Sequence, residues 1–235
     1  MYLSGARGAN TDYIFPTTYT GFANNAFTAP DSQHILYSGA ATSKASMVVG
    51  DKLVVATVDR LVAKATMMGG GTTGIPQIMP IMIEGEEHYV LVMTPWDEYN
   101  FRASAATAGS WMDIQKAAAT AEGRNSPIFK GGLGMLNNCV LHKHKSVTRF
   151  TDYGAGLNVA ASRSLFMGTQ AAVCAFGSPG TGLRYDWNEE TRDNGNQAVI
   201  TTATICGMKK TSFTIDGVVR DFGVIAVDSA AADPG

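Results

Sequence analysis

Two histidines two residues apart, His142 and His144, are the side chains whose type and spacing most readily suggest chemistry. On an extended strand such residues point to the same face, so the pair could offer two imidazole nitrogens to a metal ion. The other histidines, His34 and His88, stand in unrelated segments, and no cysteine supports the pair. A solvated strand face is the better interpretation, and we expect neither a metal nor another cofactor.

Other motifs could mark a ligand or catalytic site, but each lacks the neighbouring residues or elements that such a site needs. Asp186, Asn188 and Glu190 could supply oxygens to Ca²⁺, but the glycine and the distal glutamate of an EF-hand are missing. Gly132 and Gly134 resemble part of a dinucleotide fingerprint, but we expect a strand rather than a helix after them. There is also no G-x-S-x-G elbow and no Cys/His pair. We therefore expect no enzyme; a soluble α+β metal-dependent enzyme that uses the histidine pair is the least favoured alternative.

The composition fits a globular chain with an unusually uncharged surface. The chain has 235 residues, of which 45% are hydrophobic, so it can bury a sizeable core. Only 16% are charged, against about 25% in typical soluble domains. Interface cores are depleted in charge, so this composition suggests burial between subunits, with a small-residue-rich soluble domain as the alternative. The net charge of −2 shows no basic footprint of a nucleic-acid-binding protein.

The cysteines and the apolar segments bear on the cellular compartment. Cys139, Cys174 and Cys206 are widely spaced and form no C-x-x-C pair. Each lies in an apolar segment, so we expect three buried, reduced thiols and a reducing compartment. The start of the chain lacks the apolar region of a signal peptide. No segment approaches the roughly 20 apolar residues that a membrane span needs, so we expect no membrane partner.

The N-terminal part predicts an arm followed by a helix. Residues 1–38 show no helical or strand period and are rich in aromatic side chains, which indicates an extended arm that packs on its own domain or on a neighbour. Residues 46–68 carry apolar side chains at three-and-four spacing, which predicts a helix that the glycines at 69–71 end. The arm residues that we expect in contacts between subunits are Tyr13, Phe15, Tyr19, Phe22 and Phe27.

The middle of the chain alternates between strand and helix patterns. Residues 77–84 and 88–93 predict a hairpin, and the second strand is apolar throughout. A short helix is expected over 97–105, and a second helix over 111–121 with Ser110 as its cap. Residues 138–150 predict one strand.

The C-terminal part predicts one more helix and then strands. Residues 164–176 are apolar nearly all round, which favours a buried helix. Residues 185–196 are interpreted as a polar connection, and 197–207 as a strand rich in Thr, Ile and Val. Residues 211–215 and 218–227 predict a closing hairpin, followed by a frayed tail.

The order of seven short motifs adds a resemblance to a known family. The motifs are Tyr89–Pro95, Phe101-Arg102, Trp111–Ala118, Ser126–Gly134, Asn138–His142, Gly168–Ala172 and Gly207–Phe213. In this order they resemble the major capsid proteins of tailed bacteriophages, and in particular the capsid-protein family of coliphage N-four and its relatives. The resemblance covers roughly residues 50–227.

The resemblance implies an α+β fold of the Hong Kong 97 type, with an axial and a peripheral domain, an N-terminal arm and an extended hairpin loop. Mapped on this chain, the arm covers residues 1–45 and the peripheral helix and hairpin cover 46–95. The axial domain covers 96–190, and return strands of the peripheral domain cover 191–235. Members of the family usually carry further sequence ahead of residues 3–8, so we expect a fragment, a truncated form or a short variant.

The same resemblance implies a shell protein that assembles into hexamers and pentamers. They would build an icosahedral head around double-stranded DNA in the host cytoplasm, so the protein would reside in the virion. Portal, scaffold or decoration proteins are further implied partners, and an encapsulin-like nanocompartment shell is the alternative. The lysines that we expect to make non-specific DNA contacts are Lys143, Lys145, Lys209 and Lys210.

Overall fold

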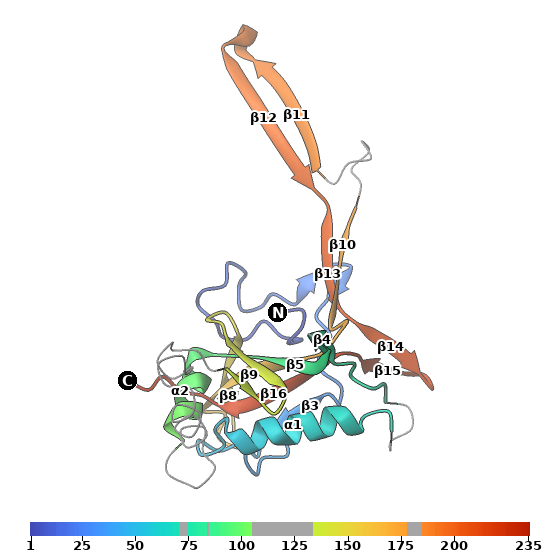
Figure 1. The fold of residues 1–235 in the computed structure, drawn as a ribbon. Coiled ribbons are helices and arrows are strands. Elements are labelled where there is room, and N and C mark those ends of the chain that lie inside the picture. Colours follow the sequence, from blue (N-terminus) through green and yellow to red (C-terminus); the bar gives the residue numbers. More distant parts are fainter. Residues whose placement is uncertain (71–74, 84, 105–133, 178–184) are drawn as a thin grey trace, which may run out of the picture.

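The computed structural model describes residues 1–70, 75–83, 85–104, 134–177 and 185–235. These residues form a body around one mixed sheet of eight strands, from which a long two-stranded hairpin projects (Figure 1). Among them, no helix is long and apolar enough to cross a bilayer.

The sheet runs in the order β3, β16, β9, β5, β7 and β6, while β4 pairs with β5 and β8 pairs with β9. β16 is parallel to β3 and antiparallel to β9, and β5 is antiparallel to β9 and parallel to β7. The strands are β3 (Ile35–Tyr37), β4 (Ile81–Ile83), β5 (Glu86–Met93), β6 (Met135–Leu136), β7 (Cys139–Lys143), β8 (Thr148–Tyr153), β9 (Val159–Met167) and β16 (Val224–Ala230).

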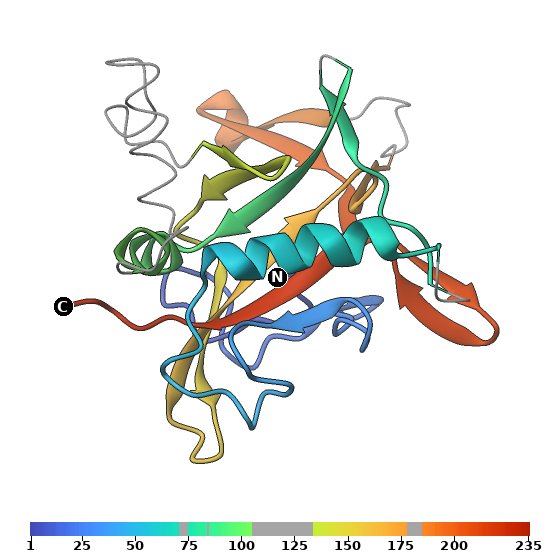
Figure 2. The same cartoon turned by 60° about the horizontal axis from the view of Figure 1, so that its bottom comes forward.

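Helix α1 (Val55–Met67) lies across one face of this sheet (Figure 2). Its apolar stripe includes Val58, Leu61 and Ala65, which are fully buried against strand residues such as Leu91 and Phe166. Apolar side chains at this spacing fall on one side of a helix, so burying them fixes how α1 rotates toward the sheet. The body's main core therefore sits between α1 and the sheet.

The helix begins nine residues later than the periodicity predicts. In residues 46–54, Asp51 accepts backbone hydrogen bonds from Val48 and Ala40 at 2.9 and 3.2 Å. Such local side-chain bonds satisfy the backbone in a loop and compete with a helix. The predicted end is confirmed, because Gly69 takes a φ of +81°, a left-handed conformation that glycine adopts without strain.

Helix α2 (Pro95–Ala103) confirms the short helix expected near 97–105. Thr94 caps it: its hydroxyl accepts the backbone N–H of Asp97 at 3.0 Å and donates to the Asp97 carboxylate at 2.7 Å. Asp97 is fully buried, and it also accepts hydrogen bonds from Ser162 of β9 and Ser229 of β16. One carboxylate thus anchors the start of α2 to two strands of the sheet.

The remaining strands form four hairpins or ribbons outside the sheet. They are β1 (Gly21–Phe22) with β2 (Asn25–Ala26), β10 (Ala172–Phe176) with β13 (Cys206–Lys210), β11 (Tyr185–Arg192) with β12 (Gln197–Thr204), and β14 (Ser212–Ile215) with β15 (Val218–Asp221). A turn of 3-10 helix, η2 (Asp193–Gly195), joins β11 to β12.

Two predictions for the C-terminal part are wrong. Residues 164–176 are not a helix but the end of β9 followed by β10. A short apolar run on a strand buried on both faces cannot be distinguished from a buried helix by periodicity. The chain turns between these strands, with Gln170 at a φ of +60°. Residues 185–196 are not a connection either, since β11 occupies most of them.

Other predictions hold in part. The hairpin of β4 and β5 is confirmed, and the strand predicted over 197–207 is β12 followed by the start of β13. The predicted strand 138–150 is two strands, β7 and β8, and the closing hairpin is β14–β15, while residues 224–227 belong to β16 of the main sheet. The helix expected over 111–121, with its cap Ser110, lies outside the described residues.

Candidate interaction surface

The projecting hairpin is a regular ribbon closed by a tight turn. β11 and β12 pair antiparallel along their whole length, from Tyr185 opposite Thr204 to Arg192 opposite Gln197. The turn places Asp193, Asn194 and Gly195 at φ values of 54°, 52° and 94°. Asp, Asn and Gly are the residues that tolerate this left-handed conformation, so the turn sequence fixes the register.

Because side chains alternate along a strand, this register sorts the ribbon into two unlike faces. One face carries Tyr185, Trp187 and Ile200, which are 61%, 60% and 55% exposed. We call these three residues the aromatic face; the charged residue beside them is Glu189. The opposite face is mostly polar: it carries Asp186, Asn188, Glu190, Arg192 and Thr201, together with Val199 and Ala203.

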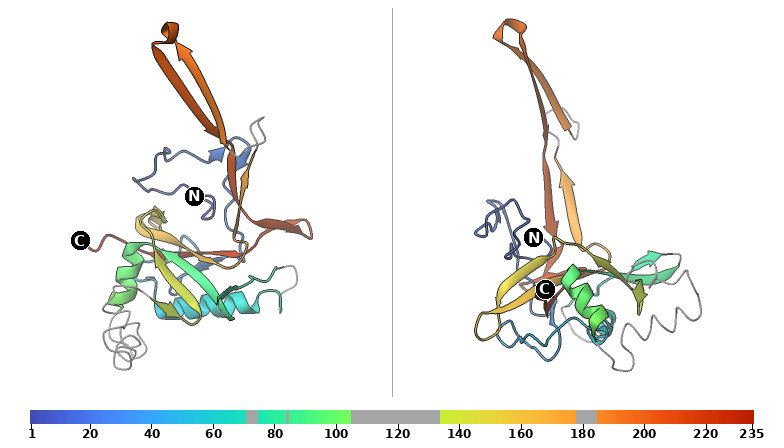
Figure 3. Two further views of the ribbon diagram at one scale, coloured as in Figure 1. Left: turned by 45° about the horizontal axis from the view of Figure 1, so that its top comes forward. Right: turned by 90° about the vertical axis from the view of Figure 1, so that its left-hand side faces the viewer.

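The aromatic face has the character of a surface that another molecule covers. The hairpin points away from the body in two perpendicular views (Figures 1 and 3). A two-stranded ribbon is at best marginally stable alone, and large apolar side chains gathered on one exposed face mark interaction sites. This face was not predicted from the sequence, although Tyr185 and Trp187 alternate with polar residues ahead of a hairpin-type turn.

The ribbon of β10 and β13 connects the hairpin to the body. Cys174 lies opposite Met208 and Cys206 lies opposite Phe176, so the four side chains share one face. Both thiols are exposed, which corrects the prediction of three buried cysteines; Cys139 alone among the cysteines is buried. Burial raises the pKa of the Cys139 thiol to about 12.

The predicted arm residues gather around one tyrosine. The Tyr19 ring stacks on Phe15 with centroids 4.2 Å apart and meets Phe22 and Phe27 edge-on. Phe22 remains 62% exposed. Tyr13 is not part of this group of rings; its hydroxyl instead donates a hydrogen bond to the backbone carbonyl of Ser146. The cluster explains why an otherwise irregular arm holds its shape, and leaves apolar surface open.

The four predicted lysines lie in different environments. Lys143 is half-exposed and pairs with Glu98 at 2.8 Å, and Lys209 is exposed. Lys145 is exposed at the rim of a cavity of about 220 Å³ that is also lined by Trp96 and Arg149. Lys210 is only 4% exposed.

Lys210, unlike the other three lysines, is buried and cannot face a ligand in solution. Its ammonium group pairs with Asp221 at 2.6 Å and donates to the carbonyls of Thr28 and Ala29 at 3.1 and 3.5 Å. A contact with DNA through Lys210 would require breaking these bonds.

Both histidines of the pair are exposed, and β7 ends between them at Lys143. His142 belongs to β7, whereas His144 follows the last residue of β7 and donates its backbone N–H to Met93. Within the described ranges, no group of three His, Cys, Asp or Glu residues is arranged to hold a metal ion.

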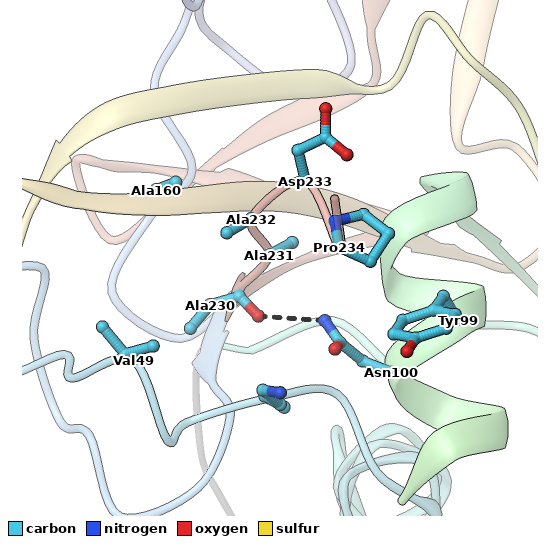
Figure 4. A pocket seen from close by; sticks show the side chains of 10 residues that line it. Val49, Tyr99, Asn100, Ala160, Ala230, Ala231, Ala232, Asp233 and Pro234 are labelled. Carbon is cyan, nitrogen blue, oxygen red and sulfur yellow. Dashed lines mark hydrogen bonds between the residues drawn. The ribbon is translucent and has the colours of Figure 1, made fainter.

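A shallow cavity of about 280 Å³ lies between α2 and the C-terminal tail (Figure 4). Tyr99 and Asn100 of α2 face the tail residues that follow β16, and the Asn100 amide donates to the Ala230 carbonyl at 3.5 Å. Asp233 and Lys52 are the charged residues of its lining. The Asn100 bond joins α2 to the end of β16 beside this cavity.

Comparisons with known proteins agree with one another. A family model described as phage capsid protein matches residues 1–233. The major capsid protein of Pseudomonas phage KPP25 is 36% identical over 119 residues, which cover 46% of this chain and 30% of that protein.

Solved structures extend the likeness to the whole chain. The capsid of Ralstonia phage GP4 matches with a TM-score of 0.79 and 52% identity, over 100% of this chain and 62% of that chain. The capsid asymmetric unit of cyanophage Pam1 matches in fold alone, with a TM-score of 0.64 and 18% identity over 89% of this chain and 57% of that one. The chain thus spans less than two thirds of the length of these relatives.

Proposed function

The chain belongs to the phage capsid protein family, and from this premise we propose that it is a major capsid subunit that associates with copies of itself. One observation of the structure carries the proposal: a hairpin that leaves the body and exposes Tyr185, Trp187 and Ile200 on one face. An isolated subunit gains nothing from such a face, whereas a shell buries it between neighbours.

The finer assignment is the Hong Kong 97 type of fold, and it is supported by the projecting hairpin, the long helix α1 and the N-terminal arm. The division into residues 1–45, 46–95, 96–190 and 191–235 belongs to the same proposal. The described strand β9, from the third range, pairs with β5 from the second and with β16 from the fourth, and β7 of the third range also pairs with β5. These boundaries therefore do not separate the described sheet into two bodies.

In this proposal the subunits form hexamers and pentamers that close into an icosahedral head around double-stranded DNA, assembled in the bacterial cytoplasm and retained in the virion. Contacts with DNA fall to Lys143, Lys145 and Lys209, which face solvent, and they are non-specific. Portal, scaffold and decoration proteins are its further partners.

Sedimentation velocity of the purified chain over a range of protein concentrations tests self-association. We expect species larger than a monomer, growing with concentration. A single monomeric boundary at every concentration and salt condition would contradict the proposal.

A further inference from the structure

A buried cluster of charged residues lies at the root of the projecting hairpin. Lys210 ends β13, Asp221 ends β15, and Asp31 and His34 belong to the arm just before β3. The exposed fractions of Lys210, Asp221 and His34 are 4%, 2% and 0%. We call these four residues the root cluster. It joins the arm to the β13–β15 region, two parts of the chain that are far apart in sequence.

The root cluster ties the hairpin to the arm through reciprocal bonds. The Asp31 backbone N–H donates to the Asp221 carboxylate at 3.2 Å, and the Asp221 backbone N–H donates to the Asp31 carboxylate at 2.7 Å. The Lys210 ammonium completes the link through Asp221 and the carbonyls of Thr28 and Ala29. The arm thus supplies two of the three acceptors of a buried cation.

The arm is held in turn to the main sheet. His34 bonds to the Asp31 carboxylate through Nδ1 at 2.9 Å, and its carbonyl accepts the backbone N–H of Ala226 in β16 at 2.9 Å. His34 Nε2 is buried without a hydrogen-bond partner in the described part of the chain. A second cation, Lys64 of α1, donates to the Ile35 carbonyl beside the cluster at 3.3 Å.

We propose that the root cluster is a latch that couples the position of residues 28–34 to the direction in which the projecting hairpin leaves the body. Removing one partner of a buried ion pair leaves an uncompensated buried charge, which is costly. The bonds of the root cluster should therefore form together or break together. Displacing Thr28 and Ala29 withdraws two acceptors from Lys210 and frees the root of β13. Phe27, which packs on Tyr19, directly precedes Thr28. A neighbouring subunit that binds the arm and displaces Phe27 would therefore also displace Thr28 and Ala29, and the hairpin could then change direction.

The neighbouring lysines of β13 allow a matched test. Lys210→Met removes the latch, whereas Lys209→Met changes an exposed lysine one position away. Spin labels on Asn194→Cys at the hairpin turn and Thr151→Cys on the body report the hairpin direction as a distance distribution. The background carries Cys174→Ser and Cys206→Ser, because both thiols are exposed.

We expect a narrow distribution in the parent and in Lys209→Met, and a broader, shifted one in Lys210→Met. An unchanged distribution in Lys210→Met would overturn the latch, and so would equal broadening in both variants. If Lys210→Met fails to fold, Asp31→Asn takes its place with the same readout. In that variant, hydrogen exchange must also accelerate in residues 206–221; unchanged exchange there counts against the latch. The test uses protein dilute enough to sediment as a monomer, so its outcome is independent of shell assembly.

Discussion

Arg163 of β9 and Asp228 of β16 lie directly opposite each other and are joined by two hydrogen bonds of 2.7 Å, with Asp228 fully buried. The Tyr153 hydroxyl donates to Asp228 at 2.7 Å, and the Ser4 carbonyl accepts from Arg163 at 3.0 Å. Burial would lower the pKa of Arg163, but the bonds to Asp228 and its charge outweigh burial and raise it. Through its bond to Ser4, the pair also holds the N-terminal segment against the centre of the sheet.

Breaking this pair should cost much more than breaking a surface pair. Arg163→Met leaves the Asp228 carboxylate buried without its cation, and we expect a loss of about 3–5 kcal/mol in the free energy of unfolding. Urea denaturation measures it. In the control Arg192→Met, which removes an exposed pair with Glu190, we expect about 0–1 kcal/mol. Equal losses in the two variants would show that the buried pair has no special role.

Acid should weaken the fold partly through Asp31. Burial would raise the pKa of Asp31, but hydrogen bonds from His34 and the Asp221 backbone outweigh it and lower the pKa below its ordinary value. A carboxyl with a lowered folded-state pKa contributes stability above its unfolded pKa of about 3.9, and loses it as the pH falls toward the folded value.

We therefore expect the unfolding free energy of the parent to fall more steeply below about pH 4 than that of Asp31→Asn. Urea denaturation at several acidic pH values measures both slopes. Asp216→Asn, in the exposed turn between β14 and β15, is the control and should keep the parent slope. Parallel curves for the parent and Asp31→Asn would exclude the contribution of Asp31.

The cysteines should divide into two classes of reactivity. Cys174 and Cys206 are exposed on the ribbon of β10 and β13, whereas Cys139 is buried and its thiol pKa is raised to about 12. Because the thiolate is the reactive form, a thiol-specific chromogenic reagent should titrate the two exposed cysteines in the folded monomer and the third only after unfolding. Rapid reaction of Cys139 in the folded protein would contradict its placement in the core.

The aromatic face should be needed for association and the polar face should not. We expect Trp187→Ser with Ile200→Ser to abolish the larger species in sedimentation, because burial of these side chains drives the contact. The matched control, Asn188→Ser with Thr201→Ser, changes the neighbouring positions on the opposite face. If only the control variant dissociates, the ribbon is covered on its polar side.

The elements that could be predicted from the sequence are those with a local physical signature. The stripe of Val58, Leu61 and Ala65, the glycine stop at Gly69 and the hairpin of β4 and β5 all depend on near neighbours in the chain. The helix predicted over 164–176 was wrong because its apolar residues belong to two different strands: those of β9 lie in the main sheet, whereas those of β10 are exposed on the ribbon with β13.

The interaction surface was harder to predict for a similar reason. Residues 185–196 contain many polar side chains because one face of the ribbon is largely polar, and the register with β12 is needed to place Ile200 on the same face as Tyr185 and Trp187. The burial of Lys210 depends on Asp221 and on the carbonyl of Thr28, 182 positions away in the chain. No local pattern distinguishes it from the exposed Lys209.

Negative-stain electron microscopy of the purified chain shows directly whether it assembles into a shell. We expect rings with fivefold or sixfold symmetry, or closed shells, and we expect these particles to be lost in Trp187→Ser with Ile200→Ser. A field of uniform monomers at every salt concentration would contradict the assignment as a self-assembling shell subunit.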